Sequence, residues 1–265
     1  MQDNRTINDS RFTGLAQIYD ASRPAMPLYP AETILRYLGR TPALTVDLGC
    51  GSGLSTVIWE GKAAQVIGIE PNDDMLAAAR SRASDTISFR KGYGHDTGLP
   101  DGCADAVVCS QSFHWMEPNS TLAEANRILS PGGVFATVDC DWPPVTRWEA
   151  EKAYMDLYTK ARRLEEELPE LKGTYIRYPK DRHLVNIRSS GYFRYTRELL
   201  FTNSESCTAQ RFYNLLLSQG SFRSVLRLVP ELQAETDIFR ETLQKIYGEE
   251  TFSVEFCYRM RIGIK

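Results

Sequence analysis

Short apolar runs alternate with helical patterns along the first half of the chain. Five buried strands are predicted, at residues 43–48, 65–70, 86–89, 104–110 and 133–138. The spacing of apolar residues predicts helices at 31–38, 54–60, 72–83 and 119–129. Because strands and helices alternate here, we expect an α/β fold, with a mostly parallel sheet and helices on both of its faces.

The alternation ends after Asp139. Residues 140–188 are rich in charged and aromatic residues, and they contain a predicted helix at 149–168 and a loop at 169–181. A strand at 192–200, helices at 208–218 and 231–247, and a last strand at 252–264 follow. An insertion after the fifth strand lies over the carboxyl edge of the sheet, where ligands bind in such folds. We therefore expect 140–188 to cap a substrate, within a single domain spanning 1–265.

Size and charge narrow the class of protein. The chain has 265 residues, enough for one packed α/β domain with an insertion, and a net charge of −3. Without a general basic field, a nucleic-acid substrate is disfavoured. The polar N-terminus has no signal-peptide pattern, and no apolar run approaches the roughly 18 residues that cross a bilayer. We expect a cytoplasmic protein without a membrane partner, and the sequence leaves its oligomeric state open.

The cysteines are scattered along the chain. The sequence has no Cys-x-x-Cys pair, and its three histidines do not cluster with the six cysteines, which are Cys50, Cys103, Cys109, Cys140, Cys207 and Cys257. This spacing favours neither a disulfide framework nor a structural zinc site, and we expect no metal.

A glycine-rich loop joins the first predicted strand to the first helix after it. Its sequence, V-D-L-G-C-G-S-G, spans 46–53. Gly49 and Gly51 can adopt backbone conformations closed to other residues and let a ligand approach the main chain. Asp47 lies at the end of the strand, and Glu70 ends the second strand, where a carboxylate can accept hydrogen bonds from both ribose hydroxyls. The pattern predicts a site for a nucleoside-containing cofactor.

Two stretches of the sequence are partly similar to other known motifs. A nicotinamide or flavin site has the pattern G-x-G-x-x-G, but Leu54 stands at the position of the third glycine. The stretch D-W-P-P at 141–144 superficially resembles the motif of amino-methylating DNA enzymes, but its order is wrong and it follows the fifth strand instead of the fourth. We reject the second motif and keep a nicotinamide-dependent oxidoreductase as an alternative.

Residues 46–53 resemble motif I of the class I S-adenosylmethionine-dependent methyltransferases. Further stretches are similar to the branch that contains ubiquinone/menaquinone-biosynthesis and trans-aconitate methyltransferases. They are F-T-G-L-A-Q-I-Y-D-A-S-R-P-A-M-P at 12–27, G-Y-G-H-D-T-G-L-P-D-G-C-A-D at 92–105, S-Q-S-F-H-W at 110–115, I-L-S-P-G-G at 128–133 and S-S-G-Y-F at 189–193. The resemblance is specific from about residue 12 to residue 140, and beyond that it is one of architecture.

The resemblance implies a Rossmann-like fold with seven strands, of which the last is antiparallel, and an N-terminal helical segment, 1–40, over the cofactor. The cofactor would be S-adenosyl-L-methionine and the product S-adenosyl-L-homocysteine. The loop would hold the methionine part, Glu70 the ribose, and Pro71 and Met75 the adenine. In the N-terminal segment, Arg23 would pair with the methionine carboxylate. The site residues expected for the cofactor are Tyr19, Arg23, Asp47, Gly49, Cys50, Gly51, Glu70, Pro71, Met75, Tyr93, Gly94, His95, Gln111 and Ser112.

The chain departs from the branch at the adenine. Tyr93, Gly94 and His95 stand where the branch has Asp-Ala-Glu, so the usual acidic contact is missing. The Gly94 main chain, stacking, or Asp96 would replace it. After the fourth strand, Gln111 and Ser112 would contact the amino group of the cofactor.

The acceptor is less well defined. His114 is a candidate general base for a hydroxyl or amine acceptor, and a packing histidine is the alternative. The aromatic residues expected to line an acceptor pocket are Trp142, Trp148, Tyr154, Tyr158, Tyr175 and Tyr178. We expect a methyltransferase acting on a small molecule, with an oxygen acceptor favoured over carbon or nitrogen. A non-catalytic protein that binds the cofactor is the other alternative.

Overall fold

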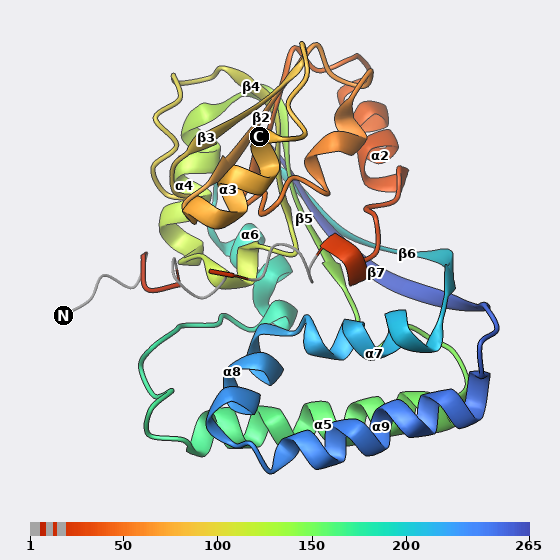
Figure 1. Ribbon diagram of the computed structural model, residues 1–265. Coiled ribbons are helices and arrows are strands. Elements are labelled where there is room, and N and C mark those ends of the chain that lie inside the picture. The colour runs from red at the N-terminus through yellow and green to blue at the C-terminus, as the bar shows by residue number, and fades with distance from the viewer. Residues whose placement is uncertain (1–5, 9–12, 15–19) are drawn as a thin grey trace.

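A seven-stranded sheet forms the centre of the protein (Figure 1). The computed structural model describes residues 6–8, 13–14 and 20–265. The strand order is β3-β2-β1-β4-β5-β7-β6. β1 to β5 are parallel, and β7 is antiparallel to both of its neighbours. This confirms the predicted fold class. The strands are β1 (Leu44–Leu48), β2 (Gln65–Glu70), β3 (Ile87–Lys91), β4 (Ala104–Ser110), β5 (Leu129–Cys140), β6 (Tyr195–Cys207) and β7 (Phe252–Ile264).

Most predicted helices form within three residues of the expected bounds. The helices are α2 (Tyr29–Leu38), α3 (Asp73–Arg80), α4 (Pro118–Ile128), α5 (Trp148–Glu167), α6 (His183–Ser189), α7 (Ala209–Leu217), α8 (Gly220–Leu228) and α9 (Leu232–Tyr247). Short 3₁₀ turns are η2 (Thr56–Trp59), η3 (Phe113–Trp115) and η4 (Lys180–Arg182). Local signals set several ends: Gly39 ends α2 in a left-handed conformation, and the Asn72 side chain caps α3 by accepting from the Met75 N–H.

The helix predicted at 54–60 is wrong, because this segment forms only the 3₁₀ turn η2. The hydroxyls of Ser55 and Thr56 donate to Asp47 Oδ2, each at 2.8 Å. Side-chain bonds of this kind compete with helix formation, and the β-branched Val57 and Ile58 add little helix propensity.

The second half of the chain holds elements that the pattern did not predict. α6 and α8 were missed, and β6 begins at Tyr195 and continues to Cys207 instead of spanning 192–200. The added part of β6 is polar, and pairing with β7 along its whole length holds it in the sheet. A pattern of alternating apolar residues could not have predicted that extension.

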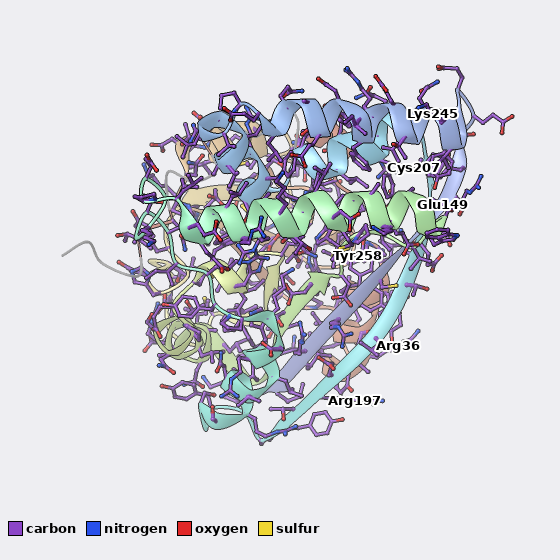
Figure 2. The ribbon with its side chains drawn as sticks, turned by 90° about the horizontal axis from the view of Figure 1, so that it is seen from below. Arg36, Glu149, Arg197, Cys207, Lys245 and Tyr258 are labelled. Carbon is purple, nitrogen blue, oxygen red and sulfur yellow. The ribbon has the colours of Figure 1, made fainter. Side chains whose placement is uncertain are left out.

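Helices cover both faces of the sheet, and a separate helical layer lies beyond its carboxyl edge. α2 and α3 contribute to the core on one face, and α4 and α6 to that on the other. α5, α7, α8 and α9 form the separate layer, which β6 and β7 reach (Figures 1 and 2). At its centre the Tyr154 ring packs edge-on against Phe212 and Phe239, with centroids 5.9 and 6.3 Å apart.

This layer is built from two separate stretches of the chain. The segment 140–188 contributes α5 to it, whereas α6 from the same segment packs against β6 and β7. The connection between β6 and β7 contributes α7, α8 and α9. The role of 140–188 as a substrate cap stays a prediction. None of the helices in the described part of the chain combines the length and the hydropathy that crossing a membrane requires.

Candidate functional site

A cavity of about 1200 Å³, counted to its open mouth, follows the carboxyl edge of the sheet. It borders the ends of four neighbouring strands and a side chain of a fifth: Glu70 on β2, Gly49 after β1, Ser110 on β4, Cys140 on β5 and Tyr258 on β7. Parallel strands end at this edge, so residues from distant parts of the sequence meet there.

Most of the residues predicted for the cofactor lie on the wall of this cavity. They are Arg23, Gly49, Cys50, Gly51, Glu70, Pro71, Met75, Tyr93, Gly94, His95, Gln111 and Ser112. Asp47 and His114 do not border it. Tyr19 lies outside the described residues. The structure therefore brings the predicted residues together, and their contacts with a cofactor stay predictions.

The glycine loop has the backbone that the sequence indicated. Gly49 and Gly51 have φ values of 65° and 57°, in the left-handed region that favours glycine. A Cβ on Gly49 would lie 2.6 Å from Met116 Cε and 2.7 Å from Ser112 Cβ. A side chain at this position would therefore collide with the far wall, so only glycine keeps the loop open.

Glu70 connects the loop to β2 and holds its carboxylate at the cavity wall. Its Oε2 accepts from the Gly51 N–H at 2.9 Å, and its Oε1 accepts from the Asn72 N–H at 3.0 Å. The side chain is largely buried. Because each carboxylate oxygen can accept a further hydrogen bond, this arrangement fits a ribose diol in the cavity.

Asp47 lies beneath the loop, not in the cavity. It is fully buried, and only the hydroxyls of Ser55 and Thr56 are seen to donate to its Oδ2. Burial raises the pKa of Asp47 to about 6, and these hydrogen bonds offset part of that effect. The position assigns Asp47 to holding the loop in place.

Pro71, Met75 and the stretch Tyr93–His95 form the wall next to Glu70. The wall is tight, since a Cβ on Gly94 would lie 2.6 Å from Met116 Sδ. The ring centroids of Tyr93 and His95 are 5.3 Å apart. Asp96 pairs with the Tyr93 main chain and does not border the cavity. Of the three groups expected to replace the missing acid, the Gly94 main chain and a stacking ring are therefore favoured.

Gln111 has an unusual backbone at the end of β4. Its φ of 56° is the only positive φ of a non-glycine residue in the described part of the chain. Lys180 Nζ donates to Gln111 Oε1 at 3.1 Å, whereas Gln111 Nε2 is buried and has no hydrogen-bond partner among the described residues. Strained backbones of this kind occur at binding sites, which supports a role for Gln111 in the cavity.

His114 is buried behind the cavity wall. Its Nδ1 lies 3.6 Å from Asp139 Oδ1, and its ring stacks on His183 with centroids 6.5 Å apart. Burial lowers the pKa of His114 to about 3, and the charge of Lys180 adds to this effect. Its role as a base stays a prediction, and this position favours the packing alternative.

A buried carboxylate that the sequence did not single out lies next to His114. Asp139 Oδ2 accepts from Arg261 Nη1 at 2.7 Å and lies 3.0 Å from His183 Nδ1. Lys180 Nζ lies 3.2 Å from Asp139 Oδ1. Burial alone would raise the pKa of Asp139, but the charge of Lys180 and the neighbouring histidines hold it well below its usual value. No local motif surrounds Asp139, because its partners come from η3, η4, α6 and β7, all distant from it along the chain.

The N-terminal segment contacts several walls of the cavity. Asn8 Nδ2 donates to the carbonyls of Trp115 and Ile176, at 2.8 and 2.7 Å. Asp20 pairs with Arg82 at 2.8 Å and accepts from the Ser52 hydroxyl in the glycine loop. These contacts agree with the expectation that this segment covers the site, which stays a prediction.

Arg23 is directed to the helical layer. Its Nη2 donates to the Ser218 carbonyl at 3.0 Å, and its guanidinium lies 4.6 Å from the centroid of the Trp142 ring. The expected pair with a methionine carboxylate therefore stays a prediction.

The expectation of an acceptor pocket lined by six aromatic residues needs correction, because Trp142 alone of the six borders the cavity. Tyr154 packs in the helical layer, and Trp148 is exposed.

Comparisons with known proteins agree with this geometry. Residues 46–137 match the methyltransferase domain family. An uncharacterized methyltransferase of Mycobacterium tuberculosis is 31% identical over 115 residues, which are 43% of this chain and 46% of the relative. A probable S-adenosylmethionine-dependent methyltransferase of Saccharomyces cerevisiae is 29% identical over 124 residues, 44% of this chain and 43% of the relative. The chain thus spans less than half the length of these curated relatives.

A solved structure extends the likeness in fold to nearly the whole chain. A putative type II methyltransferase from Anaeromyxobacter dehalogenans superposes with a TM-score of 0.70 at 20% identity, covering 91% of this chain and 97% of the other. S-adenosylmethionine is the cofactor of the family to which the glycine loop and the matched domain point. The chain is therefore similar to class I S-adenosylmethionine-dependent methyltransferases, in sequence over residues 46–137 and in fold over nearly its whole length.

Proposed function

We propose that this chain transfers a methyl group from S-adenosylmethionine to an oxygen atom of a small molecule. The observation that carries the proposal is the cavity itself. One end has a glycine loop braced by Glu70, and the other end has groups from β5, β7 and the N-terminal segment. A single cavity that spans both ends can hold two partners side by side.

The residues at the first end fit the cofactor. The Glu70 carboxylate would bind the ribose, and Pro71, Met75 and Gly94 would border the adenine. The loop at Gly49 and Gly51, which leaves the main chain accessible, would hold the methionine part. When bound, S-adenosylmethionine supplies an electrophilic methyl group on a sulfonium.

The protein's part in such a transfer is to orient the acceptor and to exclude water. Correct orientation alone can lower a barrier by several kcal/mol, up to roughly 7–11 in favourable cases. The apolar side chains of Met26, Met116 and Trp142 on the wall would remove water from the acceptor. The acceptor would react as its anion, a carboxylate or a phenolate that has lost its proton to water, so the negative charge on oxygen and the positive charge on sulfur would disappear together as the carbon–sulfur bond breaks and the carbon–oxygen bond forms.

Polar groups at the second end support an oxygen acceptor. The hydroxyl of Tyr258 and the guanidinium of Arg23 both border the cavity at this end. N–H and O–H donors suit an oxygen on the acceptor, whereas a carbon nucleophile would leave them without a partner. The net charge of −3 supports a small molecule over a nucleic acid.

The test of the cofactor site is calorimetry with S-adenosylhomocysteine. We expect Glu70→Ala to weaken binding at least tenfold, about 1.4 kcal/mol, because hydrogen bonds to a charged group are lost. Asp101→Ala, which removes an exposed carboxylate that pairs with Arg127, should leave the affinity unchanged. Unchanged affinity in Glu70→Ala, or binding of NADH instead, would refute the assignment.

The competing function is a protein that binds the cofactor without transfer. Labelled S-adenosylmethionine and a panel of phenols, carboxylic acids and amines would separate the two. Label transferred to an oxygen supports the proposal. Tight cofactor binding without transfer to any acceptor supports the alternative.

A further inference from the structure

Tyr258 carries a hydroxyl for which the described residues provide no hydrogen-bond partner. The residue lies on β7, is only 2% exposed and borders the cavity. Leaving a buried polar group without a partner costs about 1–3 kcal/mol. A hydroxyl kept in such a position at the wall of a cavity is therefore arranged to meet a polar atom of a ligand.

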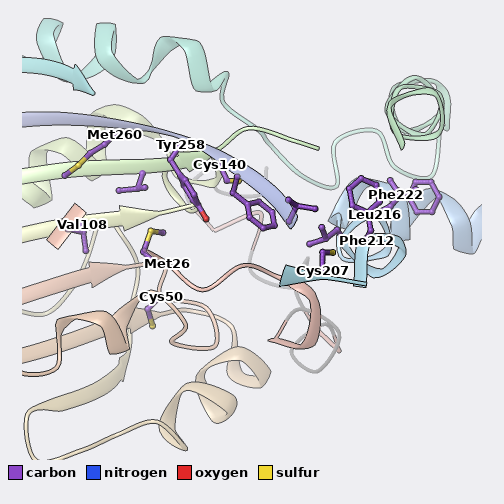
Figure 3. Close-up of a cluster of buried hydrophobic side chains, with 14 of the residues drawn as sticks. Met26, Cys50, Val108, Cys140, Cys207, Phe212, Leu216, Phe222, Tyr258 and Met260 are labelled. Atoms are coloured by element: carbon purple, nitrogen blue, oxygen red, sulfur yellow. The ribbon is translucent and has the colours of Figure 1, made fainter. Parts of the chain in front are cut away.

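The ring of Tyr258 is held in one orientation. It stacks on Phe201 of β6 with centroids 5.0 Å apart and an angle of 5° between the planes. Phe201 stacks in turn on Tyr29 of α2, at 4.6 Å and 27°. Because the stack fixes the plane of the ring, the hydroxyl is fixed as well, and Figure 3 shows it directed away from β7, with Cys140 and Met26 beside it. A preorganised donor loses little entropy on binding.

The strand order separates Tyr258 from the cofactor end. From β2, which ends in Glu70, the sheet continues through β1, β4 and β5 to β7. Neighbouring strands lie about 4.8 Å apart, so four spacings separate β2 from β7 by roughly 19 Å. With the ribose at Glu70, the residues after β1 and β4 would hold the rest of the cofactor, and the part of the cavity at β5 and β7 would remain for the acceptor.

The surroundings of Tyr258 are mostly apolar. Cys140 faces Tyr258 across the β5–β7 pairing, and burial raises the pKa of the Cys140 thiol to about 12, so the thiol stays neutral. Trp142 and Met26 border the same cavity. The hydroxyl of Tyr258 is the polar group that β7 contributes to the wall. Apart from Arg23, these lining groups are apolar, and they fit a largely apolar acceptor with one oxygen.

We propose that the Tyr258 hydroxyl binds and positions the methyl acceptor, and that the acceptor is a largely apolar molecule with one oxygen that can accept a hydrogen bond, as the oxygen of a phenol does. The inference rests on the proposed function, because it takes the cofactor to occupy the Glu70 end. Burial raises the pKa of Tyr258, so the hydroxyl stays protonated and donates to that oxygen instead of removing a proton. Tyr258 is thus a residue that selects and orients the acceptor.

Two fragments of similar size test the proposal on the full chain saturated with S-adenosylhomocysteine. Phenol offers the ring oxygen, and toluene replaces it with a methyl group. We expect the ratio of phenol to toluene affinity, measured by NMR titration, to fall about tenfold in Tyr258→Phe, while toluene binding stays unchanged. An identical ratio in both proteins would overturn the proposal.

Tyr154→Phe is the matched control. Its hydroxyl is also buried, but it accepts from Gln219 Nε2 at 3.0 Å and does not border the cavity. This variant should keep the phenol preference and lose thermal stability, whereas Tyr258→Phe should not lose stability. Calorimetry with S-adenosylhomocysteine on each protein separates this proposal from the proposed function. If the cofactor product does not bind, the proposed function is refuted. The ratio of phenol to toluene affinity, measured again without S-adenosylhomocysteine, then still tests the role of Tyr258.

Discussion

The two ends of the cavity are built in different ways. The end at β2 and β1 comes from short stretches in which neighbouring residues act together, such as the loop 46–53 and the turn after Glu70. The end at β5 and β7 gathers Arg23, Cys140 and Tyr258, which are more than a hundred residues apart along the chain. The cofactor end is therefore a local motif, and the acceptor end is a product of the strand order.

Each end also has a buried aspartate, and different groups offset the cost of burying the two carboxyl groups. Asp47 accepts hydrogen bonds from the hydroxyls of Ser55 and Thr56, and burial raises its pKa. Asp139 is surrounded by Arg261, Lys180 and two histidines, and its pKa stays low despite its burial. We therefore predict that the ion pairs of Asp139 stabilise the fold at the acceptor end, whereas Asp47 at the cofactor end can be protonated without loss of stability.

The largest expected effect is on Asp139. Asp139→Asn would remove the buried carboxylate that pairs with Arg261 at 2.7 Å and with Lys180 at 3.2 Å, and among the described residues Arg261 would keep only its pair with the partly exposed Glu198. Removing one partner of a buried pair costs about 3–5 kcal/mol, and we expect a loss of that size in guanidinium unfolding. Asp141→Asn removes a half-exposed partner of Arg259 and should cost less than about 1 kcal/mol. Equal losses of unfolding free energy in the two variants would contradict the prediction that the buried ion pairs stabilise the acceptor end.

A pH dependence of opposite sign is expected at Asp47. Its pKa is about 6 in the folded protein and 3.8 ordinarily, so between these values the folded chain keeps a proton that the unfolded chain releases. Its contribution to the unfolding free energy therefore falls as pH rises from about 4 to 6, by up to about 3 kcal/mol. Asp139, whose pKa is low, instead loses its contribution as pH falls below about 4.

Asp47→Asn tests this contribution by chemical unfolding at pH 4 and pH 7. The substitution keeps an oxygen that can accept from Ser55 and Thr56 and removes the titration. The variant should gain stability relative to the wild type on going from pH 4 to pH 7. A constant difference between the two proteins would contradict the raised pKa.

We expect a smaller effect for Gly49→Ala, which should lower the affinity for S-adenosylhomocysteine. The left-handed conformation costs about 1–2 kcal/mol for alanine, and the new Cβ would collide with Met116 and Ser112. We expect binding of S-adenosylhomocysteine to weaken about a hundredfold, near 2.7 kcal/mol. Gly39→Ala meets the same backbone strain with open space around it and should cost stability without changing affinity. A loss confined to acceptor fragments would contradict the division between the two ends.

The same division explains what the sequence could predict. Glycine spacing and strand ends predicted the loop and Glu70, because each signal lies within a few residues of the feature it describes, and the family resemblance implied the wall at Met75. The sequence contains no such local signal for Tyr258 or Asp139, because the neighbours of these two residues depend on the pairing of β7 with β5. The helix expected at 54–60 failed for the reverse reason, since the Asp47 hydrogen bonds override its local pattern.

The smallest expected effect is on His114, whose side chain is buried behind the cavity wall and lies next to Asp139. A general base contributes about 10²–10⁴-fold to a rate. With a pKa of about 3 and no position on the cavity wall, His114 cannot take a proton from an acceptor without a rearrangement. We expect His114→Gln to lower kcat by about threefold or less at every pH from 6 to 9, measured with an acceptor that the labelled panel identifies. A loss of a hundredfold or more that deepens toward low pH would restore the general-base role and extend the catalytic machinery to the acceptor end.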